Sequence, residues 1–198
     1  KELIFVIRTE VPPPGGAQLG EDGYIIPTSR KSAVKTITAH RTAFAEKGIA
    51  DAWPKVSGLI VQPGVEFGLN QIFNMPEGRD SGRQDAISEY PGICIEAHPT
   101  DYQPPETFVK LANMGFAFQK VRPALTFSLR RALYALDHIV QKATPSEKAL
   151  PQVMEAAMRK KPKHWRSQYA EADISKWHFN FADLIRYFWP LPAIQEAV

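Results

Sequence analysis

The sequence predicts an α/β fold with a parallel sheet, because apolar segments of strand length alternate with segments whose apolar residues follow helical spacing. Four segments are interpreted as strands, at 3–10, 56–62, 93–97 and 116–122. Right-handed crossovers between parallel strands bring the C-terminal ends of all the strands to one edge of the sheet. Polar residues that follow these strands are therefore expected to lie together.

The first crossovers are predicted from capping residues and loop composition. Thr28 or Ser29 can cap a helix with Ile37 and Phe44 on its apolar face, and this helix is expected to end near 47–48. A loop rich in Gly, Asn and Pro then precedes a short helix expected at 83–89.

The second half of the chain is predicted to be mainly helical. Pro104 and Pro105 open a helix before the fourth strand, and Thr126 is expected to cap a long helix after it. The apolar stripe of that long helix predicts a buried face, formed by Leu129, Ala132, Leu133, Leu136, Ile139 and Val140. Residues 144–147 predict the start of a further helix, and the dense aromatic residues beyond it are assigned to packing.

Composition limits the classes of function. The chain has 198 residues, 44% hydrophobic and 23% charged, which is typical of a soluble globular protein. A net charge of +3 with scattered Lys and Arg argues against nucleic-acid binding, and the basic run at 159–163 is interpreted as a solvated helix end. No segment has the apolar length of a membrane span and no signal peptide opens the chain, so a cytoplasmic location is expected. The single cysteine, Cys94, is interpreted as a packing residue in a reducing compartment.

Polar residues stand at the C-terminal end of every predicted strand. Alternation along each strand places them in same-face sets: Arg8 with Glu10, Glu96 with His98, Lys120 with Arg122, and Gln62 at the end of the remaining strand. Such cations suit phosphate, and carboxylates and amides suit sugar hydroxyls, so the set favours a phosphorylated, hydroxyl-rich ligand. The alternative is that these charges only pair with one another.

Five motifs resemble those of one known family. They are Thr-Glu-Val-Pro at 9–12 with Gly-Gly at 15–16, Val-Gln-Pro-Gly-Val-Glu-Phe at 61–67, Glu-Ala-His-Pro-Thr-Asp-Tyr-Gln at 96–103, Lys-Val at 120–121 followed by Pro-Ala-Leu-Thr-Phe at 123–127, and Ile-Arg-Tyr-Phe-Trp-Pro at 185–190. With these motifs the chain resembles the GatZ/KbaZ family, the non-catalytic subunit of class II tagatose-1,6-bisphosphate aldolase. Members of that family often carry the label tagatose 6-phosphate kinase.

The resemblance implies a (β/α)8 TIM barrel, of which this chain looks like strands 5–8 and a C-terminal helical region. Two domains are expected, a half-barrel at 1–142 and an aromatic-rich helical region at 143–198 packed on it. A complete barrel of this type needs about 250 residues. The sequence is therefore interpreted as an interior piece of a longer chain, with the first four strands missing from it or supplied by another chain.

Three residues depart from the pattern expected of the family. Arg8 and Arg122 stand where Gly is expected, at strand ends where Gly would let a phosphate approach the backbone. Each Arg could either grip that phosphate or fill its pocket. Pro99 stands in place of an expected Ser and stiffens the loop before Asp101.

Three functions are compatible with these observations. The resemblance implies an accessory subunit that stabilises or activates a catalytic class II aldolase subunit, in an oligomeric complex of galactitol, tagatose or N-acetylgalactosamine breakdown. The first alternative is an autonomous enzyme for aldol cleavage or epimerisation of a ketose phosphate. The second alternative is a sugar-phosphate-binding module without chemistry. No nucleic-acid or membrane partner is expected.

The candidate site residues depend on which function applies. If the chain is itself an enzyme, its catalytic residues are expected to be Glu10, Glu96, His98 and Lys120. The expected substrate- or phosphate-binding residues are Arg8, Gln62, Asp101, Arg122 and Thr126. Lys120 suits a Schiff-base mechanism, and its alternative role is an ion pair with Glu96 or Glu10.

Cofactor and kinase chemistry receive little support from the sequence. His98 is the only histidine at a predicted strand end, so no metal site is expected in this chain, and a zinc ion would belong to the catalytic partner. No other cofactor is expected. Kinase activity is disfavoured because no Gly-rich loop ends in Gly-Lys-Ser/Thr.

Overall fold

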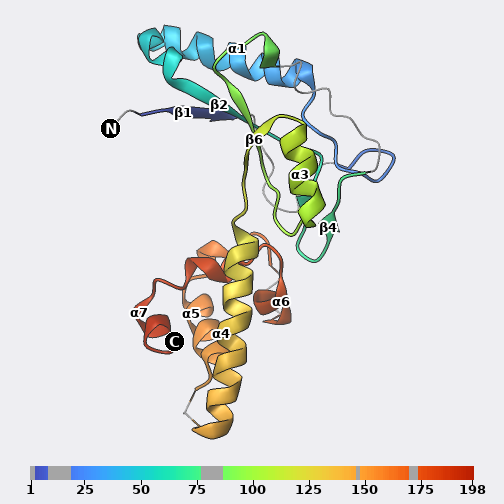
Figure 1. The fold of residues 1–198 in the computed structure, drawn as a ribbon. Coiled ribbons are helices and arrows are strands. Elements are labelled where there is room, and N and C mark those ends of the chain that lie inside the picture. Colours follow the sequence, from blue (N-terminus) through green and yellow to red (C-terminus); the bar gives the residue numbers. More distant parts are fainter. Residues whose placement is uncertain (1–2, 9–18, 77–86, 146–147, 170–173) are drawn as a thin grey trace. The chain divides into compact units, whose positions relative to one another are not determined.

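The computed structural model describes residues 3–8, 19–76, 87–145, 148–169 and 174–198. The chain forms two compact units, Lys1–Val121 and Arg122–Val198, called here the sheet unit and the helical unit. Figure 1 shows the strands in the first unit and the long helix α4 in the second. The domain division expected between 142 and 143 stays a prediction.

The sheet unit is built on four parallel strands, which confirms the predicted α/β fold. Across the sheet the strands are β1 (Phe5–Arg8), β2 (Val56–Val61), β5 (Cys94–Ala97) and β6 (Phe116–Gln119). Each is shorter than its predicted segment: β1 and β5 begin after Ile4 and Ile93, and β2 and β6 end before Gln62 and Lys120. β1 and β6 are the two edges among the described strands, and closure into a barrel stays a prediction.

Two helices of the sheet unit pack on a common core. α1 (Arg30–Glu46) begins as predicted at Ser29, whose Oγ accepts a hydrogen bond of 3.2 Å from the backbone N of Ser32. It ends before Gly48, whose φ of +70° lies in the left-handed region. α3 (Pro105–Asn113) begins at its predicted proline. The buried core comprises Ile7, Ala33, Ile37, Val56, Leu59, Val61, Ile95, Ala97, Leu111 and Phe116.

The opposite face of the sheet is less covered. The register pairs Arg8 with Ile60, Ile60 with Glu96, and Glu96 with Phe118, so these four residues form one row across the strands. Phe118 is 47% exposed, whereas the core residues of the other face are buried. Parallel sheets normally have both faces buried. This row therefore marks a face that the described residues leave partly open.

A small hairpin follows β2. It consists of β3 (Glu66–Phe67) and β4 (Ile72–Phe73), which pair in antiparallel fashion. Gly64 permits the turn into the hairpin because its φ is +95°. The short helix expected at 83–89 falls mainly on 77–86, outside the described residues.

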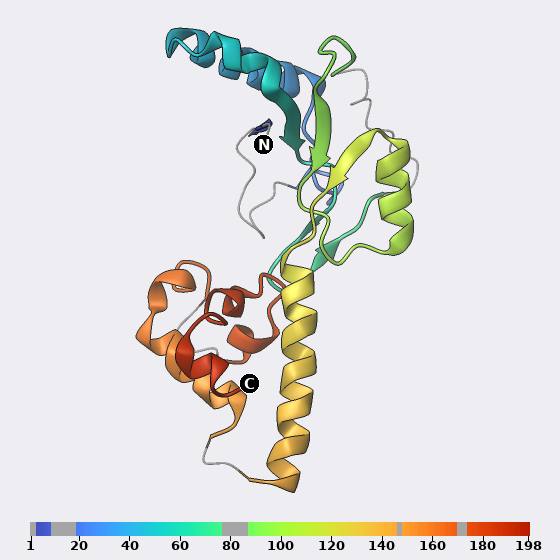
Figure 2. The same cartoon turned by 60° about the vertical axis from the view of Figure 1, so that its left-hand side comes forward.

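The helical unit gathers short helices beside one long one, as Figure 2 shows. The long helix is α4 (Pro123–Ala143), followed by α5 (Leu150–Lys160), the 3₁₀ turn η2 (Pro162–His164), α6 (Ile174–Phe179), the 3₁₀ turn η3 (Leu184–Tyr187) and α7 (Pro192–Gln195). Trp165 and Trp177 are buried, with ring centroids 4.4 Å apart, and Tyr169 and Phe188 are buried too, which confirms the assignment to packing for these four aromatic residues. Phe179, in contrast, is 67% exposed.

Two predicted helix starts are wrong. α4 begins at Pro123, a residue that suits the first helical position, so Thr126 lies inside the helix instead of capping it. α5 begins at Leu150, after the cap residue Ala149, and not within 144–147. Pro151 at the second position of α5 supplies the same local preference that Pro145 carries in the sequence.

The apolar stripe predicted on the long helix is not buried by the described residues. Leu129, Leu136 and Val140 are each more than half exposed, whereas Arg130 on another face of α4 is fully buried. The helical unit therefore packs against a face of α4 that carries charge and aromatic rings. None of the described helices combines the length and the apolar character that crossing a membrane requires.

Candidate functional site

Three polar side chains meet where β5 and β6 end. The Nδ1 atom of His98 lies 3.8 Å from Oε1 of Glu96, and Nζ of Lys120 lies 3.9 Å from the same oxygen. Backbone hydrogen bonds from His98 N to Val61 O and from Lys120 N to Ala97 O extend the ladder beyond the strands and hold these residues in register. The structure thus brings together three of the four residues predicted as catalytic, and their roles stay predictions.

The three side chains are only loosely paired. Both distances exceed the range of about 2.7–3.2 Å for a direct hydrogen bond. The side chains of Glu96, His98 and Lys120 are 15%, 32% and 42% exposed. The Glu96 carboxylate is therefore nearly buried, while the imidazole and the ammonium group reach solvent. The ion pair proposed as the alternative role of Lys120 is in place, at a distance longer than a direct hydrogen bond.

A second, buried layer lies beside this cluster. Nε2 of Gln62 donates to Oε2 of Glu66 at 3.2 Å, and Oε1 of Gln62 accepts from the backbone N of Gly64 at 2.8 Å. The other oxygen of Glu66 accepts from the backbone N of Phe67 at 3.0 Å. Gln62 was predicted as a binding residue, and here both ends of its amide are used inside the protein. In the structure Gln62 therefore holds Glu66, and its role in ligand binding stays a prediction.

Glu66 is the acidic residue of this layer, and it was not among the site residues predicted from the ends of the strands. It is 1% exposed, and burial together with the nearby charge of Asp101 raises its pKa from 4.5 to about 7, against the lowering effect of its two hydrogen bonds. A carboxyl with this pKa changes protonation state near neutral pH, as general acids and bases do. The only signal in the sequence was its place between Val65 and Phe67 in one of the family motifs.

The loop after β5 ties the two layers together. Thr100 directs both its backbone N and its Oγ1 to the carbonyl oxygen of Lys120, each at 3.1 Å. Asp101 is 2% exposed, and Tyr102 has a φ of +61°, which is uncommon for a residue other than glycine. The rings of Tyr102 and Phe67 meet edge to face with centroids 5.4 Å apart. The peptide bond between His98 and Pro99 is cis.

The remaining predicted site residues are not part of this cluster as described. Arg8 lies in the same cross-sheet row as Glu96 with β2 between them, which corresponds to about 10 Å at the usual strand spacing. Glu10 lies outside the described residues. Arg122 and Thr126 belong to the helical unit, where Thr126 Oγ1 is bonded to the Asp183 carboxylate. Phosphate binding by Arg8, Arg122 and Thr126 stays a prediction.

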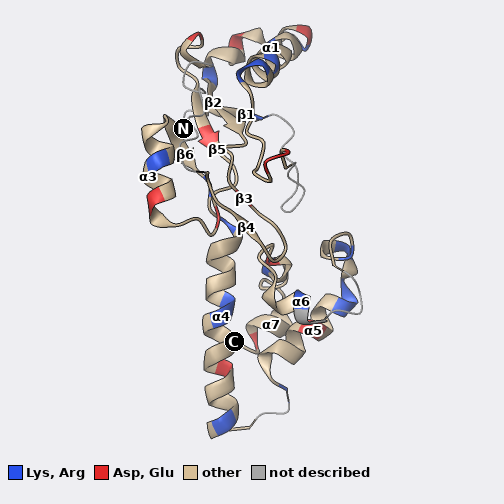
Figure 3. Cartoon of the chain, turned by 90° about the vertical axis from the view of Figure 1, so that its right-hand side faces the viewer, with Lys and Arg blue, Asp and Glu red and all other residues tan. Residues whose placement is uncertain are grey.

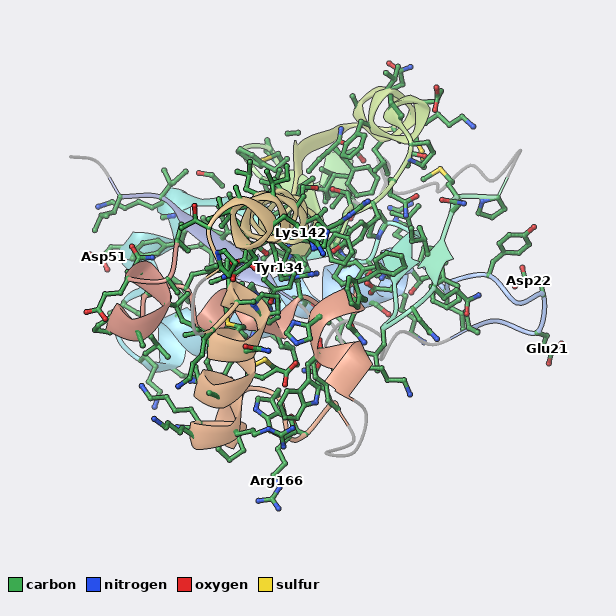
Figure 4. The ribbon with its side chains drawn as sticks, turned by 90° about the horizontal axis from the view of Figure 1, so that it is seen from below. Glu21, Asp22, Asp51, Tyr134, Lys142 and Arg166 are labelled. Carbon is green, nitrogen blue, oxygen red and sulfur yellow. The ribbon has the colours of Figure 1, made fainter. Side chains whose placement is uncertain are left out.

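The arrangement favours recognition of a polar ligand. An ammonium group and an imidazole beside a shielded carboxylate can bind phosphate and hydroxyl groups, and Glu66 can hold a proton nearby. Within the described residues, no three His, Cys, Asp or Glu side chains are grouped to hold a metal ion. The acidic residues labelled in Figure 4, among them Glu21 and Asp22 at the outer end of their loop, are exposed.

Comparison with known proteins shows which family the chain belongs to. The model of the family described as D-tagatose-1,6-bisphosphate aldolase subunit GatZ/KbaZ-like matches residues 1–198. The chain belongs to the GatZ/KbaZ-like family. A solved structure named as a probable tagatose 6 phosphate kinase from Sinorhizobium meliloti 1021 is 37% identical, with a TM-score of 0.80. The match covers 98% of this chain and 48% of that chain, so this GatZ/KbaZ-like chain spans about half the length of its relative.

Proposed function

We propose that this GatZ/KbaZ-like chain acts as an accessory subunit of a class II tagatose-1,6-bisphosphate aldolase, in which it stabilises or activates a separate catalytic subunit. The observation that carries the proposal is the family match over residues 1–198, whose description names an aldolase subunit. The (β/α)8 barrel, the oligomeric complex, its place in galactitol, tagatose or N-acetylgalactosamine breakdown and the cytoplasmic location belong to the same proposal.

Aldolase assays with three samples test the proposal: a class II catalytic subunit alone, this chain alone, and the two mixed. Cleavage of tagatose 1,6-bisphosphate is measured at once and after incubation at a temperature that inactivates the catalytic subunit. We expect the mixture to exceed the catalytic subunit in initial rate or in retained activity, and this chain alone to be inactive. Equal activity and equal loss in the mixture and in the catalytic subunit would contradict the proposal.

A second candidate is an autonomous enzyme acting on a ketose phosphate. The cluster of Glu96, His98 and Lys120 favours it, because it combines a shielded carboxylate with two groups that reach solvent. Aldol cleavage or epimerisation requires a base and a group that stabilises the developing negative charge, for which Glu96 and Lys120 are suited. Turnover by this chain alone would support this candidate, whereas sugar-phosphate binding without turnover or activation would indicate a binding module.

Two substitutions distinguish the candidates. Glu96→Gln and Lys120→Met should leave activation of the catalytic subunit intact if the chain is an accessory subunit, and should abolish turnover if it is an enzyme. Lys110→Met is the matched control, since Lys110 is an exposed lysine on α3 and is not one of the three residues of the cluster. Retained turnover in both Glu96→Gln and Lys120→Met would exclude Glu96 and Lys120 as catalytic residues, and no turnover by the unmodified chain alone would contradict the autonomous enzyme.

The kinase name of the Sinorhizobium meliloti relative is not part of the proposal. A phosphate-binding loop of the Gly-rich type needs a Gly-Lys-Ser/Thr ending, and the sequence of this chain contains none.

A further inference from the structure

Basic residues are concentrated where α5 ends in the helical unit. The basic cluster consists of five exposed residues, Arg159, Lys160, Lys161, Lys163 and Arg166. No Asp or Glu occurs between 156 and 169, and the five charges exceed the net charge of +3 of the whole chain. Figure 3 shows basic segments beside α5 and α6, and Figure 4 shows Arg166 extending away from the ribbon.

The end of a helix explains only part of the basic cluster. Arg159 and Lys160 lie in the last turn of α5, where the helix dipole favours positive charge. Lys161 is the residue that follows the helix, and Lys163 and Arg166 lie beyond it. Because the dipole effect is confined to the last turn, the residues beyond α5 require another explanation.

Acidic groups of the helical unit do not neutralise this cluster. Oε1 of Glu155 lies 3.1 Å from Nε2 of His178, and Asp183 pairs with Arg130. Among the described residues, no ion pair joins a carboxylate to the basic residues at 159–163. Like charges close together destabilise a folded chain. A partner that supplies negative charge would offset this cost.

The basic cluster stands on a packed base. Trp165 is 1% exposed, and its Nε1 donates to the carbonyl oxygen of Met158 at 2.8 Å. The backbone N of Trp165 donates to the carbonyl oxygen of Pro162 at 3.1 Å. The Arg159 guanidinium lies over the ring of Trp177, with its carbon 5.0 Å from the ring centroid. A surface that is held in place before binding loses less entropy on association.

An exposed aromatic ring borders the basic cluster. Tyr187 is 41% exposed, and its ring stacks on that of His164 with centroids 5.3 Å apart and planes at 23°. The guanidinium carbon of Arg186 lies 4.5 Å from the centroid of the Tyr187 ring, and Nη2 donates to the tyrosine oxygen at 2.9 Å. Tyr and Arg are enriched among the residues that contribute most to protein interfaces. Tyr187 therefore adds contact area to a charged surface.

A protein partner suits this surface better than a nucleic acid does. The five cations are confined to the end of one helix and the turn after it. A compact cluster matches a patch of Asp and Glu on a protein, whereas a nucleic acid presents a continuous row of phosphates.

We propose that the basic cluster, with Tyr187 at its border, is the surface through which the helical unit binds an acidic patch on the catalytic aldolase subunit. This inference rests on the accessory-subunit function proposed above. It adds which surface of the chain makes the contact and which chemistry the partner offers. Positive charge at this surface accelerates the encounter, and Tyr187 slows dissociation.

The salt dependence of binding tests the proposal on the unmodified chain. The catalytic subunit is immobilised, and binding of this chain is followed by surface plasmon resonance at about 0.05 M and about 0.5 M NaCl. We expect the association rate to fall at least about ten-fold at the higher salt concentration, because screening weakens attraction between the two surfaces.

Charge reversal tests the location of the contact. Lys160→Glu combined with Lys163→Glu should weaken binding at least about ten-fold and reduce its salt dependence. Arg131→Glu combined with Lys142→Glu is the matched control, since it changes the net charge equally at exposed residues of α4. The control should bind within about a factor of three of the unmodified chain.

Loss of the aromatic ring should have a different kinetic effect. Tyr187→Ala should raise the dissociation rate roughly five-fold or more at both salt concentrations, because it removes contact area and no charge. Circular dichroism checks that each variant is folded. The salt dependence of the unmodified chain tests the proposal even where a variant fails to fold.

Three results would overturn this inference. The first is binding of the unmodified chain that does not depend on salt. The second is equal binding of the folded Lys160→Glu and Lys163→Glu double variant, which would place the contact elsewhere and leave the accessory-subunit function intact. The third is binding of a labelled DNA or RNA duplex that the double variant loses while its binding to the catalytic subunit is unchanged. Neither binding nor activation by the unmodified chain would instead contradict the accessory-subunit function itself, and this inference with it.

Discussion

The polar groups of the two units are organised in opposite ways. In the sheet unit, Glu96, His98 and Lys120 approach one another at 3.8–3.9 Å and two of them reach solvent. In the helical unit, Nε of Arg130 donates to Oδ1 of Asp183 at 2.9 Å and both side chains are fully buried. The first arrangement places charged groups close together at a surface that solvent reaches. The second uses charge to hold helices together.

A second buried contact in the helical unit supports this contrast. His178 lies between Tyr134 of α4, labelled in Figure 4, and Glu155 of α5, with Nδ1 2.8 Å from the tyrosine oxygen and Nε2 3.1 Å from the carboxylate. A neutral imidazole that donates from Nε2 and accepts at Nδ1 satisfies both contacts. Burial raises the pKa of the Tyr134 hydroxyl, so this group stays protonated. The pKa shifts of Tyr134 and His178 are thus explained by burial among packed polar groups.

The largest effect is expected from breaking the buried ion pair. Asp183→Asn keeps the shape of the side chain but leaves the Arg130 guanidinium without a counter-charge, and the two terminal nitrogens of Arg130 have no hydrogen-bond partner among the described residues. Removal of one partner of a buried pair costs about 3–5 kcal/mol. The free energy of unfolding in urea should fall by that amount. Glu89→Gln, which removes the partner of Arg30 in an exposed pair, is the control and should cost less than about 1 kcal/mol.

The next effect is a pH dependence of the sheet unit caused by Glu66. Its pKa in the folded chain is about 7, above the ordinary 4.5, so folding favours the protonated form. Stability from this group is fully present below pH 4.5 and is lost as pH rises to about 7, a decline of about 3 kcal/mol. Hydrogen exchange of the hairpin and β2 between these pH values should report it. The decline should be absent in Glu66→Gln and unchanged in Glu89→Gln; an equal decline in Glu66→Gln would show that another group is responsible.

The helical unit should respond to pH in the opposite direction. Burial lowers the pKa of His178 below 6.5, although Glu155 acts against this and Arg130 adds to it. Folding then favours the neutral imidazole, so stability is present above pH 6.5 and declines as pH falls below it. Exchange rates in α5 and α6 should rise in that range for the natural chain. His178→Gln should remove this response, whereas His138→Gln, on the exposed side of α4, should keep it.

Local sequence signals predicted most of the sheet unit. Strand alternation, the Ser29 cap and the proline before α3 each act over a few residues, so their effect does not depend on distant parts of the chain. The apolar stripe of α4 was identified correctly, but its predicted burial is wrong for the described residues. Periodicity shows which face of a helix is apolar. It does not show which element, if any, covers that face.

The candidate site was predictable only in part for a related reason. Glu96, His98 and Lys120 were found because strand parity and the parallel sheet bring them to one edge. Glu66 and the pair of Arg130 and Asp183 were missed, since charged residues are normally exposed and no local pattern marks one that is buried. The burial of these groups results from tertiary contacts between segments far apart in sequence, such as the 53 residues between Arg130 and Asp183.

The smallest effect on stability is expected at the candidate site itself, and this is where the contrast between the units is sharpest. Lys120→Met removes a partly exposed ammonium group 3.9 Å from Glu96, and loose pairs of this kind contribute less than about 1 kcal/mol. The free energy of unfolding should therefore stay within that margin of the natural chain. If the proposed sugar-phosphate binding at this cluster is correct, binding of a sugar phosphate, measured by calorimetry, should be weakened at least ten-fold, because a positive charge that suits phosphate is lost. Lys110→Met should change neither quantity. A large loss of stability in Lys120→Met with unchanged ligand binding would mean that the cluster holds the strand ends together, as the Arg130 pair holds the helices.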